Sequence, residues 1–167
     1  MPFIVALVGI AGFVGSLLIM YCTKLGIPGI REYDPGFRLL DMRFNYSKED
    51  VYSTFEKIGE GGISAYRHYL VVDFTFIAFF LFVMILGSMK VTSNAMFRNI
   101  LIALASVRAL LDVVENSLLI YLLGKFPIQD GGIAALCSRV TTLKFIAMYS
   151  WMAIAAVLVV AHLRGAL

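Results

Sequence analysis

The sequence predicts an all-α integral membrane protein, a four-helix transmembrane bundle with a long first loop that carries a short amphipathic helix. Three observations predict this class. The 167 residues are 60% hydrophobic and have a mean hydropathy of +0.88, whereas apolar residues make up about half of a soluble domain. Four apolar segments reach the ~20 residues that one membrane crossing needs. The polar segments between them leave no room for a separate soluble domain.

We expect one transmembrane domain over residues 1–167, with spans at 3–22, 70–89, 101–123 and 140–163. The first span could instead be a signal peptide. It has no basic segment at its start and no small-residue cleavage site before Lys24, so we expect a retained helix. Within it, Gly12 and Ser16 have the small-xxx-small spacing that allows close helix approach. Packing within the chain is favoured over a dimer interface.

The first loop, residues 23–68, is expected to act as a lid. Its turn signals include Gly26-Ile27-Pro28-Gly29 and Tyr33-Asp34-Pro35-Gly36. A short amphipathic helix should follow, with Ser47 as N-cap and Asp50 completing a capping box. Its apolar face has helical spacing, and Gly59 should end it. The residues of that face are Val51, Phe55 and Ile58.

The third span carries charged residues at its centre. Arg108, Asp112 and Glu115 follow one another at i, i+4 and i+7, so a helix brings them to one face. A charge that faces lipid at mid-bilayer costs at least ~2.5–3.5 kcal/mol. The stripe must therefore face protein or a wet cavity, and intramembrane charges are by default candidates for function.

Residues of neighbouring spans should join this stripe. At ~1.5 Å of rise per residue, Asp73, Asn116 and Lys144 reach a similar depth below the long loop. We therefore predict a polar pocket that opens toward that loop, with Arg67 and His68 at its mouth. The acid/base candidates are Glu115 and Asp112. The candidate ligand-binding residues are Arg108, Asn116, Lys144, Asp73, Arg67 and His68.

The charges within the predicted pocket do not balance. Arg108 and Lys144 face three carboxylates, so one carboxyl is expected to hold a proton in a site of low dielectric constant. A shared proton suits acid/base chemistry, but a structural network would also have one. Arg108 and Asp112 could simply neutralise each other within their helix, and Glu115, Asn116 and Lys144 could clasp two helices together.

Other classes of chemistry lack their motifs. No zinc-protease, serine-hydrolase, phosphate-loop or dinucleotide pattern is present, so we expect no metal and no cofactor. The net charge of +3 includes no basic block, which argues against nucleic-acid binding. Cys22 and Cys137 form no CxxC motif, and either a disulfide or two free thiols is possible.

Basic residues give a weak indication of topology. The first and third loops hold nine Lys or Arg against three on the other side, which favours a cytoplasmic long loop. When only residues near the helix ends are counted, the ratio is four to three. The expected location is therefore a membrane crossed several times, with the long loop in the cytoplasm.

Several strings carry a resemblance: Leu40-Asp41-Met42-Arg43-Phe44-Asn45-Tyr46-Ser47, Gly59-Glu60-Gly61-Gly62, Tyr66, and Asp112-Val113-Val114-Glu115-Asn116. They resemble those of an uncharacterised group of small four-span membrane proteins, a likeness that covers most of the chain and implies no activity. In architecture the chain is similar to the EXPERA group, which includes emopamil-binding sterol isomerases. That resemblance implies acidic residues around a sterol-sized cavity, with Asp73 and Glu115 as counterparts by position. The proline-rich and histidine-containing signatures of that group are absent from the sequence.

Two classes of function follow from these features. The favoured one is recognition, with possible proton transfer, of an amphiphilic lipid- or sterol-like ligand that comes from the membrane lipids. The alternative is a non-catalytic accessory or scaffold subunit that assembles with partner membrane subunits or with copies of itself. Proton or ion translocation is less favoured, because the charges cluster in one half of the bundle.

Overall fold

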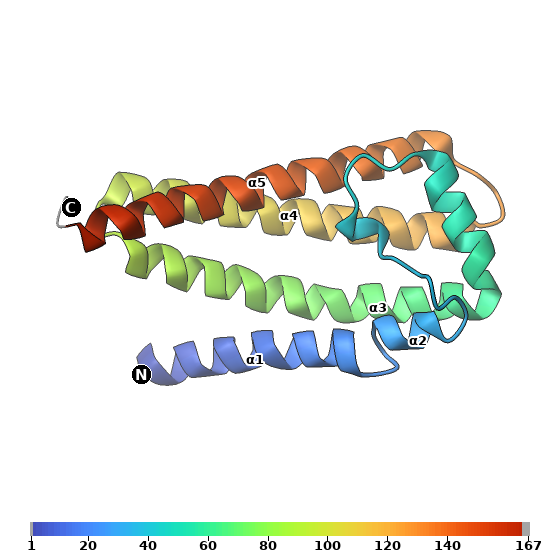
Figure 1. Cartoon of the computed structure of the whole chain (residues 1–167), viewed down its shortest axis with the longest axis horizontal. Coiled ribbons are helices and arrows are strands. Elements are labelled where there is room, and N and C mark those ends of the chain that lie inside the picture. The colour runs from blue at the N-terminus through green and yellow to red at the C-terminus, as the bar shows by residue number, and fades with distance from the viewer. Residues whose placement is uncertain (1, 165–167) are drawn as a thin grey trace.

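The computed structural model of the chain describes residues 2–164, and regular structure within that range is entirely helical. Four long helices lie side by side, and both ends of the chain lie at the same end of the bundle (Figure 1). The predicted all-helical class is confirmed. The elements in order are α1 (Pro2–Cys22), α2 (Ile27–Arg31), the 3-10 helix η1 (Leu40–Met42), α3 (Lys48–Val91), α4 (Ala95–Lys125) and α5 (Gly131–Leu163).

Three helical stretches are long and apolar enough to cross a membrane, as expected for a helical membrane protein: Phe3–Arg31, which includes α1, Lys48–Val91 and Gly131–Leu163. α4 has 31 residues and is also long enough. It is not among the three apolar stretches, because Arg108, Asp112 and Glu115 at its centre make it more highly charged than they are. Three candidate spans are therefore established by composition, and α4 needs an argument from packing.

The start of α3 matches the local sequence signals. The main-chain N–H of Asp50 donates to Ser47 Oγ over 3.1 Å, and that of Ser47 donates to Asp50 Oδ2 over 2.7 Å. This is the predicted capping box. The predicted break is also present, because Gly59 has φ 62° and ψ −174° within α3. The helix resumes at once, and the part before Gly59 lies across one end of the bundle (Figure 1).

The segment 23–68 is not a single loop. It contains α2, η1 and the first part of α3, of which only the last was predicted. The expected apolar face is buried, with Val51, Phe55 and Ile58 at most 2% exposed. These side chains belong to the main hydrophobic core, which also takes residues from α2 and from the ends of α4 and α5 nearest to it. The largest core therefore sits at the loop end of the bundle.

In the bundle, α4 packs on α3 and α5, whereas α1 packs mainly on α3 and α2. Gly9 and Gly12 let α1 approach α3, because a Cβ at either position would collide with the ring of Phe82 or Phe79. Gly9 and Gly12 thus serve packing within the chain. Cys22 is exposed, Cys137 is buried, and both are free thiols.

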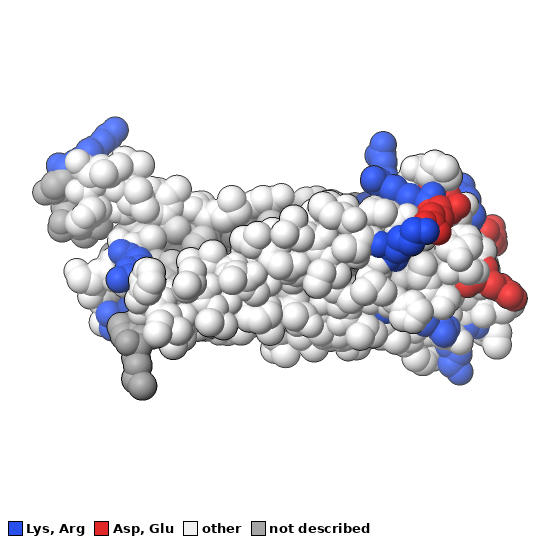
Figure 2. Space-filling model, turned by 90° about the horizontal axis from the view of Figure 1, so that it is seen from below, with Lys and Arg blue, Asp and Glu red and all other residues white. Residues whose placement is uncertain are grey.

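The surface is divided into zones of different polarity. On the face in Figure 2, charged side chains gather at the two ends of the molecule and the long middle zone is uncharged. Large apolar side chains are exposed along the long helices, such as Leu7 and Val14 of α1 and Val157 of α5. Exposed apolar area of this extent is what a lipid-facing surface requires and what a soluble monomer avoids.

Gly59 provides a test of the break in α3. Alanine at this position has open space for its Cβ, but φ near +60° combined with ψ near 180° is accessible essentially only to glycine. We expect Gly59→Ala to lower the free energy of unfolding by about 1–3 kcal/mol. The measurement is unfolding in mixed micelles of mild detergent and SDS.

Gly15→Ala is the matched control for this variant. A Cβ at Gly15 would also meet no neighbouring atom, but Gly15 lies in regular helix. Alanine there should be neutral or stabilising by up to ~1 kcal/mol. Equal effects of the two substitutions would show that the backbone at Gly59 is not constrained.

Candidate functional site

Lys144 is the centre of a buried ionic cluster. Its Nζ contacts Asp112 Oδ1 at 3.0 Å and Glu115 Oε2 at 2.5 Å, both on α4. It also donates to the main-chain carbonyl of Asp41 over 3.0 Å. Lys144 is 4% exposed, so three acceptors from two separate parts of the chain satisfy the three donors of a buried ammonium group.

Arg108 extends the cluster along α4. Its Nη2 lies 2.5 Å from Asp112 Oδ2, the i, i+4 pair that the sequence predicts. The guanidinium stacks over the ring of Phe80 at 4.4 Å, and Phe76 lies 5.8 Å away. Arg108 is 5% exposed, and within residues 2–164 its buried Nε and Nη1 atoms have no hydrogen-bond partner. Two donors of a buried charged group are therefore free to bind an acceptor.

Glu115 is fully buried behind Lys144. Its Oε1 atom accepts a short hydrogen bond from the Thr141 hydroxyl, and the Tyr46 hydroxyl lies 3.3 Å from that hydroxyl oxygen. The three side chains form a chain of hydroxyl and carboxyl groups from the loop before α3 through α5 to α4. This chain connects elements that are far apart in sequence.

Asp73 and Asn116 form the link between α3 and α4. Asn116 Nδ2 donates to Asp73 Oδ2 over 2.7 Å and to the carbonyl of Leu70 at the longer distance of 3.5 Å. Both side chains are at most 3% exposed. Asp73 thus lies close to the predicted stripe but has no cation within ion-pair distance among the described residues.

Helical periodicity explains how α4 carries so much charge. The charged side chains lie on the face that packs between α3 and α5, while Val107 and Leu110 on other faces are 48% and 64% exposed. Apolar side chains therefore face outward and ionised ones face inward. This is the reverse of the pattern of an amphipathic helix on a soluble protein.

Asp41 is a site residue that the sequence analysis missed. It lies in η1, is 4% exposed, and its Oδ1 atom is buried without a hydrogen-bond partner. Burial raises the pKa of this carboxyl above its ordinary value, the nearby Asp112 raises it further, and Lys144 opposes the shift. Its position depends on how the segment between α2 and α3 folds back onto the bundle, and no periodicity in the sequence reports this.

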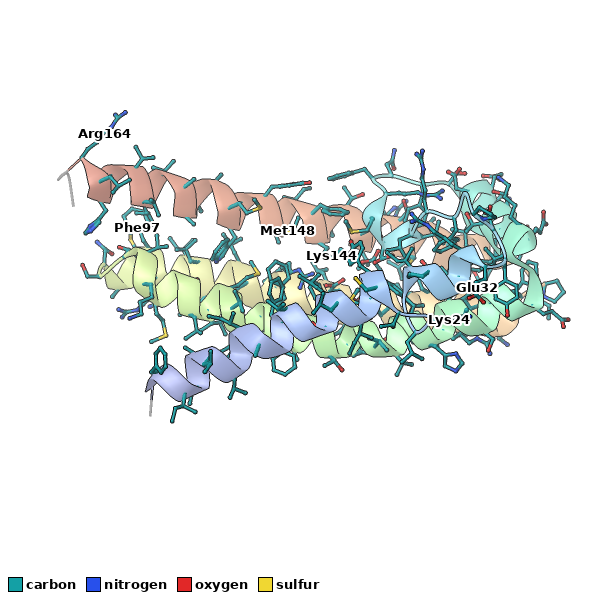
Figure 3. The ribbon with its side chains drawn as sticks, turned by 60° about the horizontal axis from the view of Figure 1, so that its bottom comes forward. Lys24, Glu32, Phe97, Lys144, Met148 and Arg164 are labelled. Atoms are coloured by element: carbon teal, nitrogen blue, oxygen red, sulfur yellow. The ribbon has the colours of Figure 1, made fainter. Side chains whose placement is uncertain are left out.

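A cavity of about 200 Å³ adjoins the cluster. Its charged lining residues are Asp41, Asp73, Arg108, Asp112 and Lys144, and the other lining residues come mainly from α1, α3 and α5. In Figure 3, Lys144 and Met148 of α5 lie on the side of that helix that faces α1. The surface is hollowed between α1 and α5 (Figure 2). The cavity therefore has one polar wall and a side that faces the apolar zone.

Four predicted site residues lie outside this lining. Arg67 and His68 are exposed on α3, and Arg67 Nη2 donates to the carbonyl of Leu123 over 2.7 Å. They are not at the mouth of the pocket, because the first part of α3 and η1 occupy that end of the bundle. Glu115 and Asn116 belong to the cluster but lie behind the cavity wall.

Removal of Lys144 tests the ionic cluster. Lys144→Met should lower the free energy of unfolding by about 3–5 kcal/mol, because it leaves the Glu115 carboxylate buried without its cation. Lys144→Met combined with Glu115→Gln should recover part of this loss. Unfolding in mixed micelles measures both quantities.

The exposed pair Lys24 and Glu32 is the matched control for this cycle. Lys24 Nζ lies 2.7 Å from Glu32 Oε1, a distance similar to those in the cluster, but the two side chains are 82% and 51% exposed. Removing one partner there should change the free energy of unfolding by less than about 1 kcal/mol. A Lys144→Met effect of the same size would contradict a buried, mutually dependent cluster.

The pKa of Asp41 predicts a dependence of stability on pH. Because the folded pKa lies above 3.8, the folded state keeps a proton that the unfolded state releases as the pH rises past that value. The stability of the wild type relative to Asp41→Asn should therefore be greatest at low pH and fall as the pH rises. Melting temperatures of both proteins between pH 4 and pH 9 measure this difference, with ~0.5-unit steps.

The exposed Glu56 supplies the control for this measurement, since Glu56→Gln removes one carboxylate far from the cluster. This variant should follow the pH profile of the wild type. A constant difference between wild type and Asp41→Asn at every pH would contradict the raised pKa of Asp41.

No protein-family model, curated protein or solved structure matches the chain. Its function must therefore be inferred from the chemistry of its own side chains. Two features call for a functional explanation. Four buried carboxyl groups (Asp41, Asp73, Asp112 and Glu115) lie near two buried cations, and the cavity is lined by Arg108 and Asp41, which each have buried polar atoms without a hydrogen-bond partner among the described residues.

Proposed function

We propose that the chain is a four-span membrane protein and that α4 is its third span. The burial of Arg108, Asp112 and Glu115 between neighbouring helices supports this, because these charges would be shielded from lipid. In this arrangement the segment between α1 and α3 and the turn between α4 and α5 lie on one side. The excess of basic residues there favours the cytoplasm.

We further propose that the protein binds the polar end of an amphiphilic, lipid- or sterol-like molecule in the cavity beside Arg108. One observation carries this proposal: Arg108 and Asp41 line the same cavity, and among the described residues Arg108 has two buried donor atoms and Asp41 a buried acceptor atom without a hydrogen-bond partner. Unpartnered buried polar atoms cost about 1–3 kcal/mol each, so a ligand that pairs with them gains that amount. A hydroxyl group can both donate to Asp41 and accept from Arg108.

The size of the cavity limits what part of a ligand it holds. At about 200 Å³ it is smaller than the 300–1,000 Å³ typical of sites that enclose a drug-sized molecule. The polar end and the first carbons of a lipid would fit, and the rest of the molecule would lie between α1 and α5 against the apolar zone. The ligand would thus enter sideways from the bilayer.

Proton transfer to such a ligand would use the carboxyls that line the cavity. A general acid or base must be within hydrogen-bond reach of the reacting group. Asp41 and Asp73 would meet this condition for a ligand in the cavity, because both line it, and they have no cation within ion-pair distance in the described part of the chain. Asp112 contacts two cations and Glu115 lies behind the wall, so both would tune the cluster rather than react.

An accessory subunit remains the alternative function. The free outer faces of α1 favour it, since this helix packs mainly on α3 and α2 and exposes large side chains such as Phe3 and Ile4. A partner helix could cover these faces. In that case the ionic cluster would serve to fix the helices of the bundle to one another.

Native mass spectrometry in a mild detergent separates the two functions. The wild type should retain a small molecule of defined mass, and its occupancy should fall at least tenfold in Arg108→Gln and in Asp41→Asn, since each loses a charged hydrogen-bonding partner worth ~1.5–3 kcal/mol. Arg98→Gln, on the same helix and away from this cavity, should keep the ligand.

The Asp41→Asn variant distinguishes loss of the ligand from loss of the fold, because removing a buried carboxylate should not lower the free energy of unfolding at neutral pH. A wild type that carries no small molecule, or that retains only other polypeptides, would support the accessory subunit instead. Undiminished ligand in both variants would show that the cavity beside Arg108 is not the binding site.

A further inference from the structure

A second polar site lies outside the ionic cluster, at the loop end of the molecule. Three arginines line an open pocket of about 540 Å³: Arg31 in the last turn of α2, Arg38, and Arg43 just after η1. Phe37 and Leu39, which are at most 6% exposed, form part of its walls. The pocket therefore presents guanidinium groups around a buried apolar base.

The three arginines of this pocket form no ion pair with the described part of the chain, although Asp50 is near enough to Arg43 to interact with its charge. Within residues 2–164, no carboxylate lies within 4.0 Å of any of the three guanidiniums. The nearby Glu32 pairs with Lys24 at 2.7 Å, and Asp41 is buried and lines the cavity beside Arg108. An anion is the ligand that this arrangement lacks.

One arginine is held in position by the fold. Arg43 Nη2 donates to the carbonyl of Arg38 over 2.9 Å, and its Nε is buried without a partner. A guanidinium fixed in this way loses less entropy when it binds and keeps its other donors available. Phosphate oxygens accept such donors in pairs, which makes arginine the usual partner of phosphate groups.

The position of the pocket indicates where its anion comes from. It shares Tyr21 and Met42 with the cavity beside Arg108, and it lies at the end of α1. Apolar side chains are exposed on α1 and in the turn that follows it, with Leu18 of α1 and Leu25 of that turn each 56% exposed. A phosphate in the pocket would thus be next to a surface suited to acyl chains, at the depth where tyrosine side chains and headgroups meet.

We propose that Arg31, Arg38 and Arg43 bind the phosphate of an anionic phospholipid whose acyl chains lie along α1. This site differs from the cavity beside Arg108 and does not depend on what the cavity holds. The pocket is large enough for a phosphate together with the glycerol that carries it. Anionic lipids concentrate in the cytoplasmic leaflet, the side that the proposed topology gives to this segment.

The test measures lipid binding to the full chain by native mass spectrometry during titration. Phosphatidic acid provides an anionic phosphate, and phosphatidylcholine of the same chain length provides a zwitterionic one. The variant Arg31→Gln/Arg38→Gln/Arg43→Gln should bind phosphatidic acid at least tenfold more weakly than the wild type does. The corresponding triple lysine variant, which keeps the charge but not the paired donors, should show an intermediate loss.

A matched control removes the same charge elsewhere at the same end of the molecule. Lys48, Lys57 and Arg139 are exposed and do not line the pocket, so their triple glutamine variant should bind phosphatidic acid as the wild type does. An equal loss in this control would overturn the proposal in favour of a nonspecific charge effect. Equal binding of the two lipids by the wild type would also overturn it.

Inorganic phosphate separates a lipid site from a site for free phosphate. Because the acyl chains contribute to binding along α1, inorganic phosphate at millimolar concentration should not displace phosphatidic acid from the wild type. Displacement would assign the pocket to a soluble phosphate instead. Occupancy of the cavity beside Arg108, read from the same spectra, should stay unchanged in the triple glutamine variant, so this proposal and the proposed function succeed or fail separately.

Discussion

The buried ammonium group of Lys144 joins three separate parts of the structure. Lys144 from α5 contacts two carboxylates of α4 and the main-chain carbonyl of Asp41, so one side chain joins two long helices to the segment folded between α2 and α3. A buried charge is tolerated only when its donors are satisfied, and here all three are used. The arrangement of Asp112 and Glu115, and with it the shape of the cavity wall, therefore depends on the position of Lys144.

Much of this could be predicted from the sequence, because the relevant signals are local. The spacing of Arg108, Asp112 and Glu115 requires only the period of a helix, and membrane energetics then require that the stripe face inward. Ser47 and Gly59 mark a helix start and a break through their own backbone chemistry. That Lys144 meets the stripe followed from comparing depths along two neighbouring helices.

The rest depends on contacts that no local pattern encodes. Asp41 joins the site because the chain between α2 and α3 returns to the bundle, and the sequence there shows only turn residues. Arg67 and His68 were expected at the mouth because they precede a span, yet the first part of α3 covers that end and leaves them on the outer face. Whether Glu115 faces the cavity or the space behind it is a question of side-chain packing, which helix periodicity does not resolve.

The break at Gly59 affects how a ligand reaches the buried carboxylates. The part of α3 that precedes Gly59 lies over the turn between α4 and α5. The Tyr52 hydroxyl accepts from the N–H of Asp130 over 2.5 Å, and Phe55 packs edge-on against Phe126. Protein thus covers the part of this end that lies over α4 and α5, and for a chain embedded in a bilayer we expect a lateral route between α1 and α5. A ligand must then partition into the membrane first. Its apparent affinity, expressed per aqueous concentration, would rise roughly fourfold with each added methylene, even if its contacts with the protein stayed the same.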